Sequence, residues 1–359
     1  MRKRVLVTIF TAALFLAACG SKGSDTVQPV NDETSVETTT NHGVEESEST
    51  ADVDGFTPVG GTIRVGTMTN SELQWIVAVA QEKGIFAQYG LTVETTEFAA
   101  GIQTVDAIVQ GQLDIGYAAD FAAVNRIGQV ADVTDLTIFT INNHSGDSYH
   151  LYYNPKTVTD INDISGKNVR SGPGTVAEYW VYKLLEYQGL SVDDVNIVNT
   201  EDNATTLALA ANDELDLIFA NPVLQEKLEE YGWQSSEIST ETIGSLVYSL
   251  LVANRSYLDA NNDLVATFLL AYEEAQDYVL SNTDEAADIV YQVFGLDQES
   301  FLTYIGTANL ELGIPNAAVQ DLNEINEWAY HFGLYEHEYN VEDFIDSNPL
   351  NTAFGGAQS

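Results

Sequence analysis

The chain has 359 residues, a length typical of two domains with extensions, and 45% of its residues are hydrophobic, which excludes a wholly disordered protein. Its 54 acidic and 13 basic residues give a formal net charge of −41, and this charge argues against nucleic acid and anionic membrane surfaces as partners. A single cysteine excludes an intrachain disulfide and a cysteine-based zinc cluster.

The N-terminus carries a predicted targeting signal. Three basic residues, 2–4, precede an apolar run over 5–18 that is too short to cross a bilayer core of about 30 Å. The run ends Leu16-Ala17-Ala18-Cys19, which resembles a bacterial lipoprotein signal, in which the cysteine is acylated and becomes the mature N-terminus. We therefore expect a signal peptide over 1–18, a lipid on Cys19 and a flexible acidic tether over 19–61.

The next elements in the chain alternate between strand and helix. The sequence predicts strands at 62–69, 90–94 and 113–117, with helices at 72–83 and 101–110 between them. The middle of the chain repeats the pattern with a helix over 177–185 and a strand over 215–219. Two strand–helix–strand blocks predict an α/β fold of two similar lobes with mostly parallel sheets.

Two β-rich stretches, 136–153 and 246–253, are placed to carry the chain between the lobes and back. Helices are predicted at 264–280, 284–294, 298–305 and 316–332, followed by a return strand or loop with a frayed tail. The expected organisation is a first part of lobe I over 62–144, lobe II over 145–247, the return of lobe I over 248–345 and a tail over 346–359.

The segment from about 62 to 334 resembles the substrate-binding proteins of nitrate, sulfonate and taurine ABC importers, a family shared with binders of thiamine pyrimidine precursors. The resemblance implies a type II periplasmic-binding-protein fold, in which two lobes close on a small ligand. The motifs that carry it are Ile63-Arg-Val-Gly, Ala80-Gln-Glu-Lys-Gly-Ile-Phe86, Gly90-Leu-Thr-Val, Phe98-Ala-Ala-Gly101, Gly111-Gln-Leu-Asp-Ile-Gly116, Ile164-Ser-Gly-Lys-Asn-Val169, Gly189-Leu, Ala253-Asn-Arg-Ser-Tyr-Leu258 and Asn282-Thr-Asp-Glu-Ala286.

Ligands of open α/β sheets bind beyond the carboxyl ends of the strands. At one of these strand ends, Asp120 is predicted either to face an ammonium group or to be a helix N-cap. Trp75 is predicted either to cover the ligand or to belong to the core. The glycine-rich start of the helix near 175 suits an anion or is an ordinary turn capped by Thr175. The predicted ligand-binding residues are Thr69, Asn70, Ser71, Trp75, Gly101, Gln103, Asp120, Gly172, Gly174, Thr175 and Asn221.

Together these features predict a lipid-anchored receptor at the extracytoplasmic face of the membrane. We expect it to be a monomer that binds a sulfonate, taurine or nitrate and delivers it to ABC permease and ATPase subunits, with no cofactor, metal or catalytic residue. The alternatives are a binder of a pyrimidine or thiamine precursor, an enzyme on the same scaffold, and a sensory lipoprotein.

Overall fold

The computed structural model describes residues 56–145, 149–173, 175–200, 202–220 and 222–355. They all fall within one compact unit, 48–359. The predicted signal peptide, Cys19 and all but the last residues of the predicted tether lie outside the described residues.

The first strand–helix–strand block forms as the sequence predicts. Its elements are β1 (Gly61–Met68), α1 (Glu72–Glu82), α2 (Ile85–Gln88) and β2 (Leu91–Phe98), and the two strands pair in parallel along their whole length. Gly84 adopts a positive φ of 71° between the two helices, a conformation that ends α1 at low cost because glycine has no Cβ.

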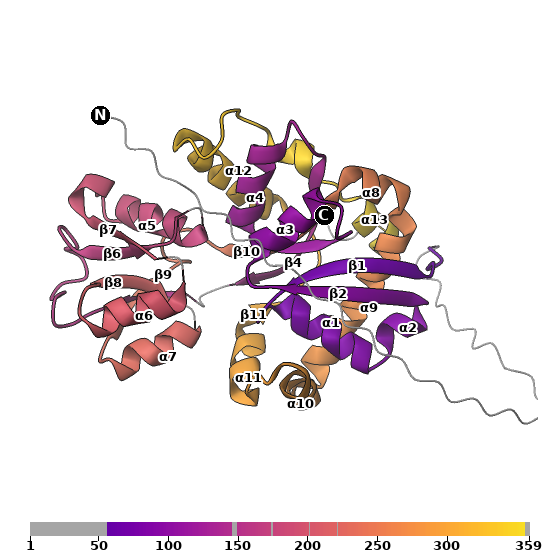
Figure 1. Ribbon diagram of the computed structural model, residues 1–359, viewed down its shortest axis with the longest axis horizontal. Coiled ribbons are helices and arrows are strands. Elements are labelled where there is room, and N and C mark those ends of the chain that lie inside the picture. Colours follow the sequence, from indigo (N-terminus) through magenta and orange to yellow (C-terminus); the bar gives the residue numbers. More distant parts are fainter. Residues whose placement is uncertain (1–55, 146–148, 174, 201, 221, 356–359) are drawn as a thin grey trace, which may run out of the picture. The chain divides into compact units, whose positions relative to one another are not determined.

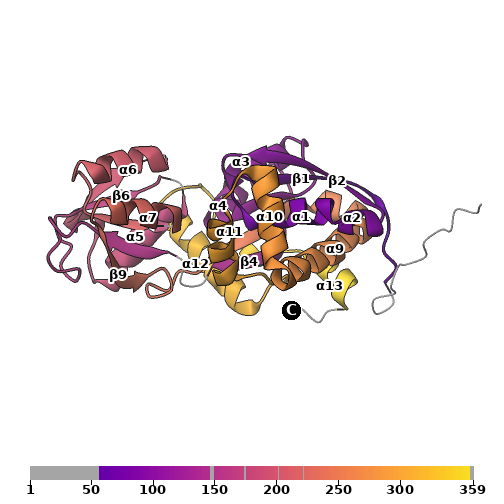
Figure 2. The same cartoon turned by 90° about the horizontal axis from the view of Figure 1, so that it is seen from below.

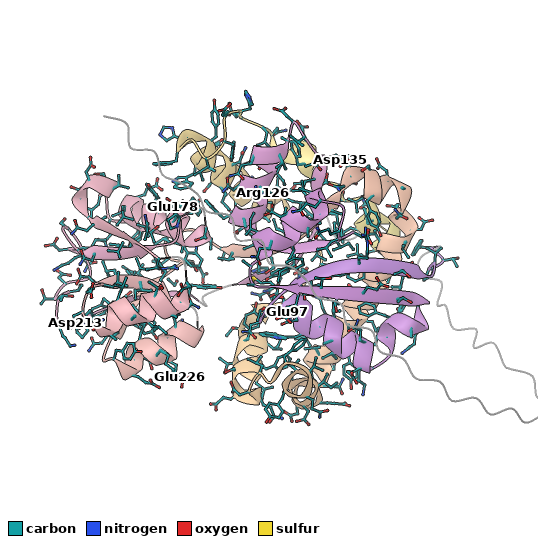
Figure 3. The ribbon with its side chains drawn as sticks, in the orientation of Figure 1. Glu97, Arg126, Asp135, Glu178, Asp213 and Glu226 are labelled. Atoms are coloured by element: carbon teal, nitrogen blue, oxygen red, sulfur yellow. The ribbon has the colours of Figure 1, made fainter. Side chains whose placement is uncertain are left out.

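The second block belongs to a four-stranded sheet that an isolated bridge joins to the pair of β1 and β2, and we refer to these strands together as the first sheet. The block contains α3 (Gly101–Val109), β3 (Gly116–Ala119) and α4 (Asp120–Val130), and an isolated bridge between Val65 and Ile115 joins β3 to β1. Beside β3 lie β10 (Val247–Asn254), β4 (Leu136–Ser145) and β11 (Ala308–Asn309), in the order β11-β4-β10-β3. The helices α3 and α4 lie next to each other (Figure 1), and an ion pair of 2.8 Å between Arg126, labelled in Figure 3, and Asp106 links them.

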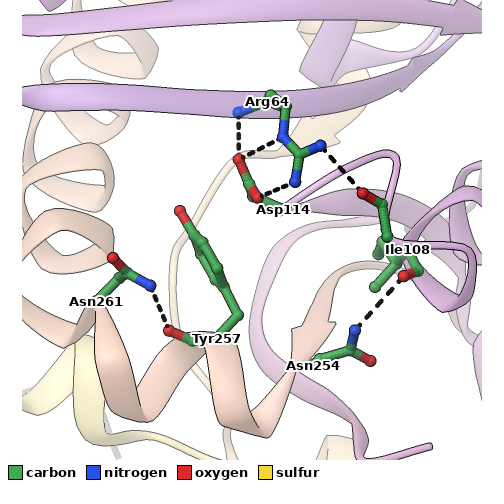
Figure 4. Close-up of polar contacts among 7 residues, drawn as sticks. Arg64, Ile108, Asp114, Asn254, Tyr257 and Asn261 are labelled. Atoms are coloured by element: carbon green, nitrogen blue, oxygen red, sulfur yellow. Dashed lines mark hydrogen bonds and ion pairs between the residues drawn. The ribbon is translucent and has the colours of Figure 1, made fainter.

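A second ion pair fixes β1 against the turn before β3 (Figure 4). The guanidinium of Arg64 contacts Asp114 at 2.6 Å and also donates to the carbonyl of Gly111 at 3.0 Å. The other carboxylate oxygen of Asp114 accepts the backbone N–H of Arg64 at 2.8 Å. Because one aspartate binds both the backbone and the side chain of Arg64, it sets the register between these two segments.

The middle of the chain builds a separate five-stranded sheet in the order β7-β6-β8-β5-β9. Its elements are β5 (His150–Tyr153), β6 (Asn168–Ser171), α5 (Val176–Tyr187), the short helix η1 (Val192–Asp194), β7 (Asn196–Asn199), α6 (Asn203–Ala211), β8 (Leu217–Ala220), α7 (Pro222–Glu230) and β9 (Gln234–Ser239).

Both sheets are mixed rather than mostly parallel. Pairs inside the strand–helix–strand blocks are parallel, namely β1 with β2 and β6 with β7 and β8. The strands next to the two crossings, β4, β5, β9 and β10, pair antiparallel with their neighbours. In this structure β10, by which the chain returns to the first sheet, runs opposite to β3 and β4, and the repeated blocks alone do not reveal this direction.

Helices dominate the end of the chain (Figure 2). They are α8 (Arg255–Ala260), α9 (Asn262–Ser281), α10 (Thr283–Phe294), α11 (Gln298–Thr307), α12 (Asn316–His331), η2 (Val341–Phe344) and α13 (Asn348–Phe354). The expected frayed tail is wrong over its first part, because α13 packs on α9 and buries Leu350 and Ala353. In place of the expected return strand, Ile345 forms an isolated parallel bridge with Ile138.

Aromatic side chains connect the two sheets through the helices between them. Tyr179 of α5 stacks on Phe121 of α4, with ring centroids 6.0 Å apart, and Trp328 of α12 packs against both at 5.4 and 5.7 Å. One hydrophobic core therefore continues from the first sheet into the second.

Candidate functional site

The turn after β1 contains three of the predicted ligand residues. The hydroxyl of Thr69 donates to Glu97 at 2.7 Å, and Asn70 adopts a positive φ of 59°. Ser71 caps α1 by accepting a hydrogen bond from the backbone N–H of Gln74 at 3.3 Å. These residues build the start of α1, and their contact with a ligand stays a prediction.

Glu72, the first residue of α1, is completely buried. Its carboxylate accepts hydrogen bonds from the hydroxyls of Tyr304 at 2.8 Å and Tyr117 at 3.1 Å and from the side-chain amide of Asn142 at 3.2 Å. The three donors come from α11, β3 and β4, so four elements that are distant in sequence meet at one carboxylate.

Buried polar atoms without a hydrogen-bond partner among the described residues belong to side chains that contact Glu72 or its donor Tyr304. They are the indole nitrogen of Trp75 and the side-chain oxygens of Asn142 and Asn143, all of them buried. Trp75 packs edge-on against Tyr304, with ring centroids 5.0 Å apart, and Asn143 donates to the Tyr304 hydroxyl at 3.3 Å. We refer to the following residues as the Glu72 cluster: Glu72, Trp75, Tyr117, Asn142, Asn143 and Tyr304.

The structure gives Trp75 the burial of a core residue together with an unmet hydrogen bond. It is 3% exposed, yet its N–H has no acceptor in the part of the chain that the structure describes. Unpaired buried polar atoms are rare in folded proteins, so their concentration beside Glu72 points to a ligand or ordered water. Sequence reasoning missed the other members of the cluster, although Asn142 and Asn143 stand out as adjacent amides inside an apolar strand.

Asp120 occupies the other predicted strand end and is also completely buried. Its oxygens accept the backbone N–H groups of Phe121 at 2.6 Å and Tyr248 at 2.9 Å. Burial raises the pKa of Asp120 to about 7. Asp120 is the first helical residue and Ala119 is the N-cap, so the N-cap interpretation of Asp120 is wrong by one position. A role opposite an ammonium group stays a prediction.

Tyr149 interacts with the carboxylates of both Glu72 and Asp120 and contacts α5, a helix beside the five-stranded sheet. Burial and the negative charges of Glu72 and Asp120 raise the pKa of Tyr149 to about 12. Its ring lies 4.7 Å from that of Trp180 in α5, whose buried indole nitrogen also lacks a partner among the described residues. Unpaired donors thus come from helices associated with both sheets.

The start of α5 is built as the sequence predicts. Thr175 is the N-cap and accepts the backbone N–H of Ala177 at 3.3 Å, which confirms the capping interpretation. A Cβ on Gly172 would lie 2.7 Å from the Thr175 hydroxyl and 3.4 Å from the guanidinium of Arg170. Burial lowers the pKa of Arg170, which sequence reasoning did not identify as a neighbour of this helix end. Anion binding here stays a prediction.

The start of α3 contains Gly101 and Gln103. A Cβ on Gly101 would lie 3.0 Å from the Cα of Ala118, so a glycine allows α3 to lie close to β3. The side-chain oxygen of Gln103 accepts the backbone N–H groups of Ala99 at 3.1 Å and Ala100 at 3.3 Å, and contact of Gln103 and Gly101 with a ligand stays a prediction. The remaining predicted residues, Gly174 and Asn221, lie outside the described residues.

A cavity of about 550 Å³ lies away from the Glu72 cluster, next to Asp135 and Arg255. Arg255 donates to the backbone carbonyls of Asp343 at 2.8 Å and Ile345 at 3.3 Å and pairs with Asp346 at 3.5 Å. Its donors are used within the fold, so this cavity offers an anion little. Within the described residues, no group of three or more metal-ligating side chains could hold a metal, and no helix is long and apolar enough to cross a membrane.

Comparisons with known proteins support the resemblance seen in the sequence. The chain is 23% identical over 244 residues to a protein of Brucella abortus (strain 2308) named as a binding protein, covering 67% of this chain and 74% of that one. It is 24% identical over 221 residues to 4-amino-5-hydroxymethyl-2-methylpyrimidine phosphate synthase of Aspergillus parasiticus, covering 56% of this chain and 62% of the enzyme.

The fold matches the crystal structure of the periplasmic aliphatic sulphonate binding protein SsuA from Escherichia coli, with a TM-score of 0.68 and 15% identity over 79% of this chain and 92% of that chain. It is therefore the two-lobed α/β fold of the type II periplasmic binding proteins. The family described as NMT1/THI5 like matches residues 75–286, more than half of the chain. The chain belongs to the NMT1/THI5 like family.

Proposed function

We propose that this protein is an extracytoplasmic solute receptor that binds a small polar molecule between its two lobes. The observation that carries the proposal is the Glu72 cluster. It lies at the carboxyl end of β1, where the fold places ligands, and it combines a buried carboxylate with unpaired hydrogen-bonding atoms.

The family and the fold support this function. Relatives named as binding proteins share the sequence pattern, and a sulphonate binding protein shares the fold. A sulfonate, taurine or nitrate remains our leading ligand class, with Arg170 and the start of α5 as the expected partners of an anionic group. A pyrimidine or thiamine precursor is the alternative ligand, and the similarity to a pyrimidine phosphate synthase supports it.

The proposed biological setting comes from the N-terminus. Cys19 would carry a lipid that holds the receptor at the outer face of the membrane, where the loaded form would dock on ABC permease and ATPase subunits. The same signal argues against a biosynthetic enzyme, which would act in the cytosol. Mass spectrometry of the membrane fraction would test it, because an unmodified Cys19 in a retained leader contradicts the anchor.

A binding screen tests the receptor function. The chain from residue 20 onward would be tested by calorimetry and thermal unfolding with taurine, ethanesulfonate, nitrate and 4-amino-5-hydroxymethyl-2-methylpyrimidine. A ligand present at about 100 times its Kd stabilises the fold by about 2.7 kcal/mol, so a true ligand raises the melting temperature clearly. Binding without chemical change of the ligand supports a receptor, whereas conversion to a product supports the enzyme alternative.

A further inference from the structure

We infer that the Glu72 cluster selects a solute with a nitrogen-bearing head group that donates hydrogen bonds, such as an ammonium or an amino-heterocycle, and rejects a bare anion. This inference rests on the proposed receptor function and narrows its ligand class. It follows from the charge at Glu72 and from the directions that the neighbouring hydrogen bonds impose.

The first step concerns charge. Glu72 is 0% exposed, and all its hydrogen-bond donors given above are neutral groups. The ion pairs formed among the described residues involve other carboxylates. A buried carboxylate needs a compensating charge or a full set of donors. From the described residues, Oε1 of Glu72 accepts the bond from Asn142 alone, so it can accept another from a ligand.

The second step concerns Asn142. Its side-chain nitrogen donates to Oε1 of Glu72 at 3.2 Å and to the hydroxyl of Tyr272 at 3.3 Å. Rotating the amide by 180° would place its oxygen against a carboxylate oxygen, so chemistry fixes the orientation. The amide oxygen has no partner within the described ranges and is therefore a buried acceptor that can bind a donor.

The same logic orients Asn143. The hydroxyl of Tyr304 gives its proton to Glu72 at 2.8 Å, so only its lone pairs remain for Asn143 at 3.3 Å. Asn143 must then present its nitrogen to Tyr304, and its oxygen is a second acceptor without a partner among the residues described. Among the described residues, the cluster thus combines one carboxylate and two unpaired amide oxygens with a single unpaired donor, the indole N–H of Trp75. This balance suits N–H groups and opposes nitrate or an alkylsulfonate head.

Matched ligand pairs test the inference on the chain from residue 20 onward. Calorimetry would compare taurine with ethanesulfonate, and 4-amino-2-methylpyrimidine with 2-methylpyrimidine, since each pair differs chiefly in the amino group. We expect the amino member of at least one pair to bind about 10- to 150-fold more tightly, the range of a charge-assisted hydrogen bond. Which pair responds distinguishes an ammonium from an amino-heterocycle.

Variants assign the effect to the cluster. Glu72→Gln removes the charge with little change of shape and should abolish most of the preference for the amino member. Asn143→Leu removes one acceptor and tests the same point if Glu72→Gln fails to fold. Glu82→Gln is the matched control, because Glu82 is exposed on the same helix and should leave every affinity unchanged.

Two results would overturn the inference while leaving the receptor function standing. One is equal affinity for both members of both pairs. The other is an equal loss for both members in Glu72→Gln, which would make Glu72 a purely structural carboxylate. If none of the four probes binds, the inference fails; if the compounds of the wider screen also fail to bind, the proposed function fails with it.

Discussion

Asp120 lies where α4 meets the crossing strand β10, and its carboxylate holds the two together. One oxygen accepts the N–H of Phe121 and the other that of Tyr248. Burial opposes the charged form more strongly than these two bonds favour it, so the pKa of Asp120 rises from 3.8 to about 7. The ionisation state of this residue therefore affects the stability of the crossing near neutral pH.

The pH dependence of stability tests this account. Between about pH 4 and pH 7 the folded protein keeps a proton on Asp120 that the unfolded chain has lost, so the contribution of this group to the free energy of unfolding falls as pH rises. We expect the difference in unfolding free energy between wild type and Asp120→Asn to fall by about 3 kcal/mol over this range. Urea denaturation at several pH values measures it, and a constant difference would show that the pKa of Asp120 is not raised.

At the scale of elements, α13 ties the end of the chain to the core. Leu350 is 3% exposed and belongs to the same hydrophobic cluster as α1 and α9. A short helix of seven residues is not stable by itself in water. Its stability must therefore come from packing on α9.

Truncating one side chain tests the docking of α13. Leu350→Ala should lower the free energy of unfolding by about 2–5 kcal/mol, because it removes a buried side chain and leaves a cavity. Asn351→Ala, at the next and exposed position, should change it by less than about 0.5 kcal/mol. Equal effects of the two substitutions would mean that α13 does not stabilise the fold through its apolar face.

Local patterns explain which elements could be predicted from the sequence. The periodicity of α1, α5, α9 and α12 and the capping residue Thr175 all depend on neighbours a few positions away, and the structure confirms them. The last helix, α13, could not be predicted, because it is short and depends on contacts with a helix about 80 residues earlier.

The sequence indicates where the candidate site lies but not most of the residues that form it. The predicted strand ends pointed to the region of Ser71 and Trp75, where the Glu72 cluster lies, since topology alone determines where strands end. Glu72, however, looks in the sequence like an ordinary acidic residue in the first turn of a helix. Its burial depends on Tyr304, which is 232 positions away, and no local pattern carries that information.

At the scale of the whole molecule, acidic residues far outnumber basic ones. The chain has 54 acids for 13 lysines and arginines, and acids such as Glu97, Asp213 and Glu226 lie exposed on different parts of the surface (Figure 3). Surface ion pairs such as Lys183 with Glu324, at 3.7 Å, contribute about 0–1 kcal/mol each and cannot balance such an excess. Repulsion between exposed carboxylates must therefore destabilise the folded state at low ionic strength.

Salt should relieve this repulsion. The Debye length falls from about 30 Å at 0.01 M to about 10 Å at 0.1 M, so carboxylates farther apart than that no longer repel strongly. We expect the melting temperature to rise over this interval of NaCl concentration and to rise less steeply above it. Scanning calorimetry with an uncharged osmolyte as control separates screening from a general solute effect. A melting temperature that stays flat or falls with NaCl would mean that the acidic residues are compensated locally, because screening would then weaken attraction at least as much as repulsion.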